Sequence, residues 1–207
     1  MCETIKESKY LKPSGYGKGF IGLGKYNPSV HKKERSLWGG LMERCFSEAY
    51  HKAKPTYKDV TVCTDWINFQ SFAAWCESQE FFNAKDDSGK AYQLDKDVLV
   101  KGNKVYSPET CCFIPSQINS LFSYVKSTKG EYPAGVSYVK GRGNFHAYYS
   151  KNGKRVNLGY FKTPEQAFNA YKAAKESHIK FMANLWKDRI DDKVYQALMS
   201  YEVHIDD

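Results

Sequence analysis

The fold is decided by the stretch GVSYVKGRGNFHAYYSKNGKRVNLGYFKTPEQAFNAY, residues 135–171. Three short runs rich in β-branched and aromatic residues are separated by two glycine-containing turns, and the second turn carries the Asn152-Gly153 pair typical of a two-residue hairpin. After the third run the apolar spacing becomes helical. Thr163 can cap this helix, Pro164 suits its first position, and Gln166 can complete a capping box. The sequence therefore predicts a three-stranded antiparallel sheet packed on one helix.

Side-chain spacing predicts which face of this sheet is open. The apolar stripe of the helix should cover one face through Ala167, Tyr171, Ala174, His178, Phe181 and Leu185. Because strand residues alternate, the helix-facing set is expected to be Phe145, Ala147, Tyr149, Val156, Leu158 and Tyr160. The open face would then carry His146, Tyr148, Ser150, Arg155, Asn157 and Gly159, with Lys140 and Arg142 at the first turn. Such side chains reach phosphates and base edges of nucleic acids.

At these residues the chain resembles the DNA-binding domain of plant APETALA and ethylene-response transcription factors, which also occurs in phage homing endonucleases. The resemblance rests on Gly135-Val136, Phe145 with Ala147, Leu158-Gly159-Tyr160-Phe161, Thr163-Pro164-Glu165-Gln166-Ala167 and Ala170-Tyr171-Lys172-Ala173-Ala174. That family lays its sheet in the DNA major groove. The resemblance therefore implies base or phosphate contacts for Ser137, Tyr148, Ser150, Arg155 and Asn157. Most of the family's arginines are absent, although Arg155 is kept, so a different target sequence is expected.

Charge and composition narrow the class of partner. The 207 residues carry a net charge of +8; residues 126–187 contain 12 Lys and Arg and 3 Asp and Glu, which gives +9 there and −1 elsewhere. A basic module beside a neutral one indicates a polyanionic partner. No apolar run approaches the length of about twenty residues needed for a membrane span, and the first residues lack a signal peptide's apolar core. We expect a cytoplasmic protein, in the bacterial host cytoplasm if it is phage-encoded, with its six cysteines reduced and mostly buried.

A second candidate site lies in residues 94–119. Two β-like runs, joined by a turn at residues 101–104, precede a helix expected from about Pro115 to Tyr124. A β-hairpin followed by a helix is the skeleton of a ββα-metal nuclease, in which oxygen ligands from the first strand and the helix hold a divalent cation. Asp95 and Asn119 would supply those ligands.

This run resembles the HNH motif of phage homing endonucleases. Asp95-Lys96 takes the place of Asp-His, Thr110 that of the middle Asn, and Asn119 the last place. The resemblance implies Mg²⁺ or another divalent cation at Asp95 and Asn119, with Lys96 where the general base stands. A lysine base needs a pKa lowered by about three units. If Lys96 stays charged, it would instead neutralise a phosphate. The general base would then come from another element, through His31, His51 or His146.

The sequence thus predicts an α+β protein with an HNH-like ββα-metal domain and a helical leader at residues 1–126. An APETALA-type domain follows at residues 134–187, and residues 188–207 form a C-terminal helix and tail that packs on this domain or makes a homodimer contact. The predicted function is double-stranded DNA binding, with metal-dependent nicking or cleavage as the enzymatic hypothesis. The alternatives are a catalytically inactive, regulatory DNA-binding phage protein and an interaction protein that binds an acidic host partner.

Overall fold

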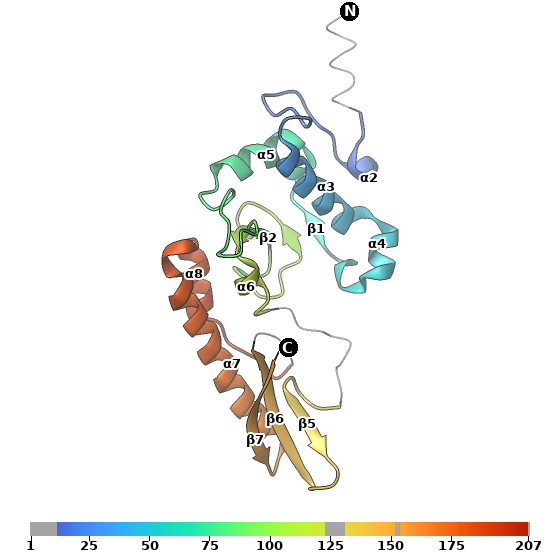
Figure 1. Cartoon of the computed structure of the whole chain (residues 1–207). Coiled ribbons are helices and arrows are strands. Elements are labelled where there is room, and N and C mark those ends of the chain that lie inside the picture. The colour runs from blue at the N-terminus through green and yellow to red at the C-terminus, as the bar shows by residue number, and fades with distance from the viewer. Residues whose placement is uncertain (1–11, 123–130, 152–153, 207) are drawn as a thin grey trace, which may run out of the picture. The chain divides into compact units, whose positions relative to one another are not determined.

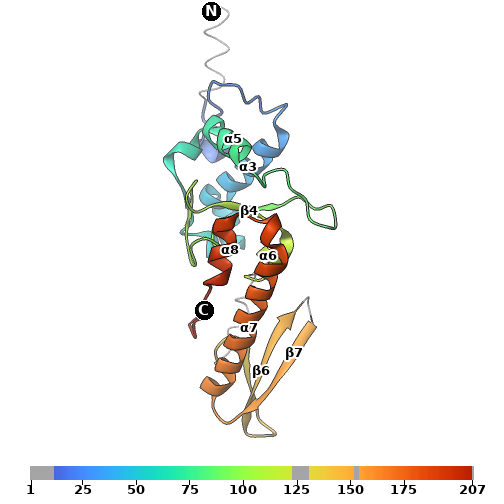
Figure 2. The ribbon, with the colours of Figure 1, turned by 90° about the vertical axis from the view of Figure 1, so that its left-hand side faces the viewer.

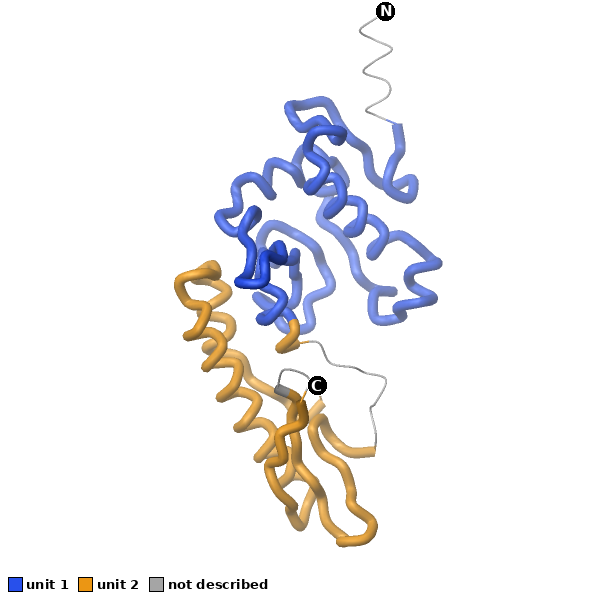
Figure 3. The backbone as a smooth tube through the Cα atoms, in the orientation of Figure 1, with its two compact units in different colours: residues 1–119 blue, residues 120–207 orange. Residues whose placement is uncertain are grey.

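The computed structural model describes residues 12–122, 131–151 and 154–206. The chain divides into two compact units, residues 1–119 and residues 120–207, drawn in blue and orange in Figure 3. Within the described residues, no helix combines the length and the apolar character that crossing a membrane requires.

Unit 1 is built mainly from short helices around an aromatic core. Its elements are α2 (Gly15–Lys18), α3 (Lys32–Phe46), α4 (Glu48–Ala53), η1 (Pro55–Tyr57), β1 (Thr61–Val62), η2 (Thr64–Ile67), α5 (Phe69–Ser78), β2 (Gln93–Asp95), β3 (Val105–Tyr106), β4 (Cys112–Ile114) and α6 (Ser116–Asn119) (Figure 1). The apolar stripe of α3 is buried through Trp38, Leu41, Met42 and Cys45. Helix α3 packs on α5, and the Trp38 indole donates a hydrogen bond of 2.7 Å to the Trp66 carbonyl.

The strand pairing of unit 1 differs from the predicted hairpin. Strand β2 pairs antiparallel with β4, so that Asp95 lies opposite Cys112. Strand β3 instead pairs in parallel with β1, with Thr61 opposite Val105. The predicted hairpin turning at residues 101–104 is therefore wrong, because the run at β3 finds its partner in a strand more than forty residues earlier. Helix α6 ends at Asn119, earlier than predicted, and residues 120–122 belong to unit 2.

Unit 2 confirms the predicted sheet and helix. It contains β5 (Val136–Val139), β6 (Asn144–Lys151), β7 (Lys154–Phe161), α7 (Pro164–Trp186), η4 (Lys187–Arg189) and α8 (Asp192–Met199). The strands form one antiparallel sheet in the order β5-β6-β7, and α7 lies along one face of it (Figure 2). The Thr163 hydroxyl accepts the Gln166 backbone N–H at 3.3 Å, as the sequence predicts. The Asn152-Gly153 pair itself lies outside the described residues.

A bulge in β7 changes which residues reach the open face. Ala147 lies opposite Gly159, whereas Tyr148 lies opposite Asn157, so that Leu158 is one residue too many on its strand. Gly159 adopts φ +114°, a region that favours glycine. Beyond the bulge the alternation shifts by one residue. The assignment of Tyr160 to the helix face and of Gly159 to the open face is therefore wrong.

The buried face of α7 also departs from the predicted stripe in its second half. Ala167, Tyr171 and His178 are buried, but Phe181 and Leu185 are 57% and 56% exposed. The buried residues there are instead Ile179, Ala183 and Trp186. The reason is a change of neighbour, because α7 packs on α8 as well as on the sheet. Helix α8 buries Val194 and Leu198, so it packs within its own unit.

The C-terminal segment completes the core of unit 2. Val203 is buried with Val136, Ala147 and Phe168. Two charged side chains of α7 hold this segment, because Lys172 Nζ donates to the Val203 carbonyl at 2.8 Å and Glu176 accepts the Val203 N–H at 2.8 Å.

Candidate nucleic-acid interface

The face of the β5-β6-β7 sheet opposite α7 gathers polar and aromatic side chains in cross-strand rows. Ser137, His146 and Tyr160 lie opposite one another across the three strands. The next rows pair Tyr148 with Asn157 and Ser150 with Arg155. Residues paired across strands project from the same side of a sheet, so these rows form one surface.

Five side chains on this surface contact one another in a continuous row, which we call the aromatic strip: Arg142, Tyr160, His146, Tyr148 and Arg155. The guanidinium carbon of Arg142 lies 4.6 Å from the centre of the Tyr160 ring. The His146 ring stacks on Tyr160 at 4.9 Å and on Tyr148 at 5.6 Å between ring centres, with 27° between planes in both pairs. The guanidinium carbon of Arg155 lies 4.4 Å from the Tyr148 ring centre. A cation therefore stands at each end of three stacked rings.

Asn157 joins this strip to the bulge. Its side-chain oxygen accepts the Gly159 backbone N–H at 2.9 Å and lies 3.0 Å from His146 Nε2. The bulge thus has two effects on the surface, because it turns Tyr160 outward and aims the Gly159 N–H at Asn157. The amide fixes the His146 ring in the middle of the strip.

The electrostatic character of this surface is cationic. Lys140 and Arg142 in the first turn and Arg155 on β7 are exposed. The three strands contain no Asp or Glu at any position. Guanidinium, ammonium, amide and hydroxyl donors without neighbouring carboxylates are suited to phosphate oxygens and to acceptor atoms on base edges.

Seven of the eight residues predicted to contact DNA lie on this surface, and the eighth, Lys140, is exposed in the first turn beside it. Six of them lie in the strands, namely Ser137, His146, Tyr148, Ser150, Arg155 and Asn157, while Lys140 and Arg142 lie in the first turn. Tyr160 is the residue that sequence reasoning missed. The available signal was Gly159, since a glycine inside a strand pattern often marks a bulge that reverses the alternation after it.

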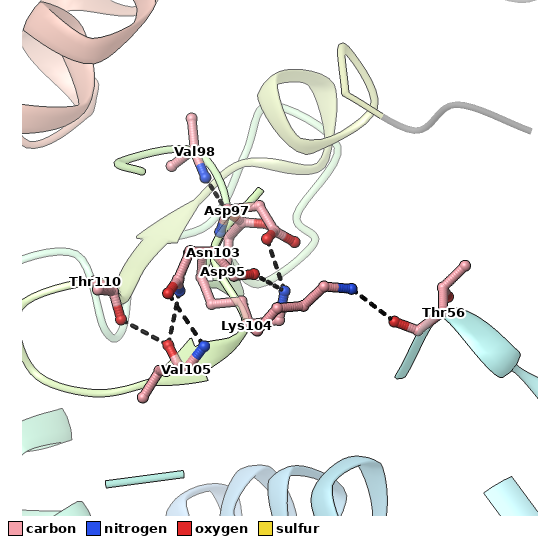
Figure 4. Close-up of polar contacts among 9 residues, drawn as sticks. Thr56, Asp95, Asp97, Val98, Asn103, Lys104, Val105 and Thr110 are labelled. Atoms are coloured by element: carbon pink, nitrogen blue, oxygen red, sulfur yellow. Dashed lines mark hydrogen bonds and ion pairs between the residues drawn. The ribbon is translucent and has the colours of Figure 1, made fainter. Parts of the chain in front are cut away.

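The predicted nuclease residues lie in unit 1: Asp95 ends β2 (Figure 4), Lys96 begins the loop that follows, and Asn119 ends α6. Asp95 Oδ1 accepts the backbone N–H groups of Asp97 at 2.8 Å and Val98 at 2.7 Å. Burial raises the pKa of the Asp95 carboxyl, and the two backbone hydrogen bonds partly offset this effect. Asp95 therefore organises a tight turn at the start of the loop.

Lys96 and Asn103 clamp the same loop. Lys96 is buried, and its Nζ donates to Asp97 Oδ1 at 2.7 Å and to the Asn103 carbonyl at 2.9 Å. Asn103 Nδ2 donates to the carbonyls of Lys96 and Val105 at 2.7 Å each. Thr110, in the place of the motif's middle Asn, donates to the Val105 carbonyl at 2.8 Å (Figure 4). These contacts are structural, and sequence reasoning missed the contribution of Asn103.

Asn119 contacts β2 through Gln93, because its Nδ2 lies 2.6 Å from Gln93 Oε1. Gln93 and Asp95 are two residues apart on β2 and so project to the same side. Of the three histidines considered as replacement bases, His31 contacts the Asn27 carbonyl and His51 the Arg44 carbonyl. The third, His146, lies in unit 2 and contacts the Asn157 side chain. In residues 12–122, 131–151 and 154–206, no three His, Cys, Asp or Glu side chains are grouped so that they could hold a metal ion.

Comparison of the chain with protein-family models, with curated proteins and with solved structures finds no match.

Proposed function

We propose that the protein binds double-stranded DNA through the open face of the β5-β6-β7 sheet. The observation that supports this proposal most directly is the aromatic strip with a guanidinium group at each end. Arg142 and Arg155 would contact phosphates or guanine edges, with Lys140 adding charge at the turn. Ser137, Ser150, His146 and Asn157 would contribute shorter-range hydrogen bonds.

The stacking within the strip favours duplex over single-stranded DNA. Single strands are bound largely by stacking their bases on exposed aromatic rings. Here each of the three rings already has two neighbours in the strip, and Tyr160 for example contacts both Arg142 and His146. A base would have to displace one of those neighbours. The polar edges of the strip are better suited to the grooves and backbone of a duplex.

Binding to an acidic protein is the alternative use of this cationic surface. The two partners differ in salt dependence, because a DNA complex releases condensed counterions and its affinity falls steeply with salt. Both hypotheses use the same side chains of this surface. The slope of affinity against salt concentration therefore distinguishes DNA from an acidic protein.

The test is fluorescence anisotropy with a pool of duplexes and with single strands of the same sequences, over a series of salt concentrations. Arg155→Ala is compared with Lys180→Ala, which removes the same charge from an exposed position on α7. We expect Arg155→Ala to weaken duplex binding by about tenfold or more and to reduce the salt slope by about one. Lys180→Ala should behave as wild type. Equal effects of the two variants would contradict the assignment of this face.

Cleavage of the bound DNA is a second candidate function, and the contact between Asn119 and Gln93 favours it. That contact brings Asn119 to β2, whose Asp95 projects to the same side as Gln93. In this hypothesis Asp95 and Asn119 would hold Mg²⁺ or another divalent cation. The residues present do not fit such a centre well, because Asp95 Oδ1 already holds the turn and Lys96 is an ammonium donor to two oxygens. We therefore favour binding without cleavage and derive no catalytic step.

Nicking of supercoiled DNA with Mg²⁺ or Mn²⁺ tests this preference. Asp95→Asn is the informative variant, because it removes the charge but keeps an oxygen that can accept the turn's N–H groups. We expect no nicking by wild type while binding persists. Metal-dependent nicking that is lost in Asp95→Asn, with binding kept, would instead establish the enzyme.

A further inference from the structure

The middle of the aromatic strip contains a titratable group on a sheet whose three strands have no Asp or Glu. His146 lies between the two tyrosines of the strip, and its Nε2 lies 3.0 Å from the Asn157 side-chain oxygen. The proposed DNA-binding function gives His146 no specific role beyond a hydrogen bond. Its position allows a more definite inference, which rests on that function.

The hydrogen bonds around Asn157 determine which ring nitrogen of His146 can titrate. The Asn157 atom that lies 2.9 Å from the Gly159 N–H must be the oxygen, since a backbone N–H only donates. The same oxygen lies 3.0 Å from His146 Nε2, so Nε2 must carry a hydrogen and donate. The atom that gains or loses a proton is therefore Nδ1. When neutral it accepts a hydrogen bond, and when protonated it donates one.

The groups that face His146 come from all three strands and the first turn. Ser137 lies opposite it on β5, Tyr148 follows on β6, and Tyr160 and Asn157 lie on β7. The full charges of the strip are the guanidinium groups of Arg142 and Arg155, each stacked on a tyrosine that contacts His146. Because β5, β6 and β7 contain no carboxylate, none of these strands supplies an anion that would stabilise an imidazolium.

A bound duplex would supply that anion. Its phosphates bring closely spaced negative charge to the surface, and its base edges bring acceptor atoms that a protonated Nδ1 can donate to. We propose that His146 takes up a proton at Nδ1 when the strip binds DNA, so that DNA affinity is linked to pH. A proton taken up on binding strengthens the complex as pH falls, and the gain is lost as pH rises through the range in which the bound imidazolium deprotonates.

The same geometry provides a matched variant. The Nε2 amide of glutamine can replace His146 Nε2 as donor to Asn157, so His146→Gln keeps the hydrogen bond and removes only the titrating nitrogen. His204→Gln is the control, because His204 is an exposed histidine of the C-terminal segment, outside the sheet. Both variants leave Arg142 and Arg155 in place.

The experiment measures duplex affinity of the full chain between pH 6 and pH 8 at constant ionic strength. Proton uptake is measured in the same range by calorimetry in two buffers of different ionisation heat. For wild type and His204→Gln we expect affinity to fall by about tenfold over this range, which corresponds to an average net uptake of about half a proton on binding. For His146→Gln we expect both effects to disappear, so that its duplex affinity is the same at pH 6 as at pH 8 and no net proton is taken up.

The outcomes separate this inference from the function on which it rests. If no variant binds duplex DNA at any pH, the proposed function fails. If wild type binds but shows neither pH dependence nor proton uptake, or if His146→Gln keeps both, DNA binding stands and the role of His146 is overturned.

Discussion

The sharpest stability prediction compares two glycines with the same backbone conformation and different surroundings. Gly135 has φ +72° and Gly143 has φ +64°. A Cβ added at Gly135 would overlap the buried ring of Tyr171 and come within 2.7 Å of the Tyr148 carbonyl, whereas one added at Gly143 would have no atom within 4 Å. Gly135→Ala and Gly143→Ala therefore share the backbone term and differ in the steric term.

The expected magnitudes follow from these two terms. A left-handed conformation costs an alanine about 1–2 kcal/mol relative to glycine, and this is the whole expected loss for Gly143→Ala. Forcing an additional methyl group into a packed core costs about 1–3 kcal/mol more. We therefore expect Gly135→Ala to destabilise unit 2 by about 2–5 kcal/mol, because neither the Tyr148 carbonyl on β6 nor the Tyr171 ring can move without disturbing the sheet.

Hydrogen exchange followed by mass spectrometry is the appropriate assay, since it reports the stability of unit 2 separately from that of unit 1. Peptides from β6, β7 and α7 should lose protection in Gly135→Ala, and peptides from α3 and α5 should not change. The reasoning is refuted if Gly135→Ala loses no more stability than Gly143→Ala.

Three further predictions concern individual side chains. Hydrogen bonds from Ser88, Lys90 and Ser116 lower the pKa of the Asp86 carboxyl to about 2. The stability that this carboxylate contributes should therefore be lost as pH falls from 3.8, the ordinary pKa of Asp, toward 2. Acid titration monitored by circular dichroism should show a smaller acid-induced loss of stability in Asp86→Asn. Val203→Ala should cost unit 2 about 1–3 kcal/mol in urea unfolding, because Val203 is buried in its core, whereas Ile205→Ala at a 45% exposed position should be nearly neutral. Cys45, Cys76, Cys111 and Cys112 are buried, and burial raises the pKa of the first three thiols. A thiol reagent at neutral pH should therefore label these four residues only after unfolding, and rapid labelling of any of the four in the native protein would contradict its burial.

The sequence by itself determined most of the local structure of unit 2. Thr163 and Pro164 mark the start of α7 because capping and the fixed φ of proline act within one helical turn. The first turn and the alternation along β6 follow in the same way, so the polar residues of that strand could be assigned to the open face before the structure was known. These features depend on interactions between residues close in the chain, so they can be predicted from the local sequence.

Only the tertiary structure decided the features that depend on distant partners. The bulge at Gly159 places Tyr160 in the aromatic strip, and it becomes evident only when β7 is paired with β6. The parallel pairing of β3 with β1 is set by a strand that precedes it by more than forty residues, and the exposure of Phe181 follows from the packing of α8 on α7. Lys96 shows the same principle in the second candidate site, because its burial and its contacts with Asp97 and Asn103 depend on how a long loop closes. Periodicity in a sequence predicts which residues share a face, but the partner that covers that face is selected by contacts between distant parts of the chain.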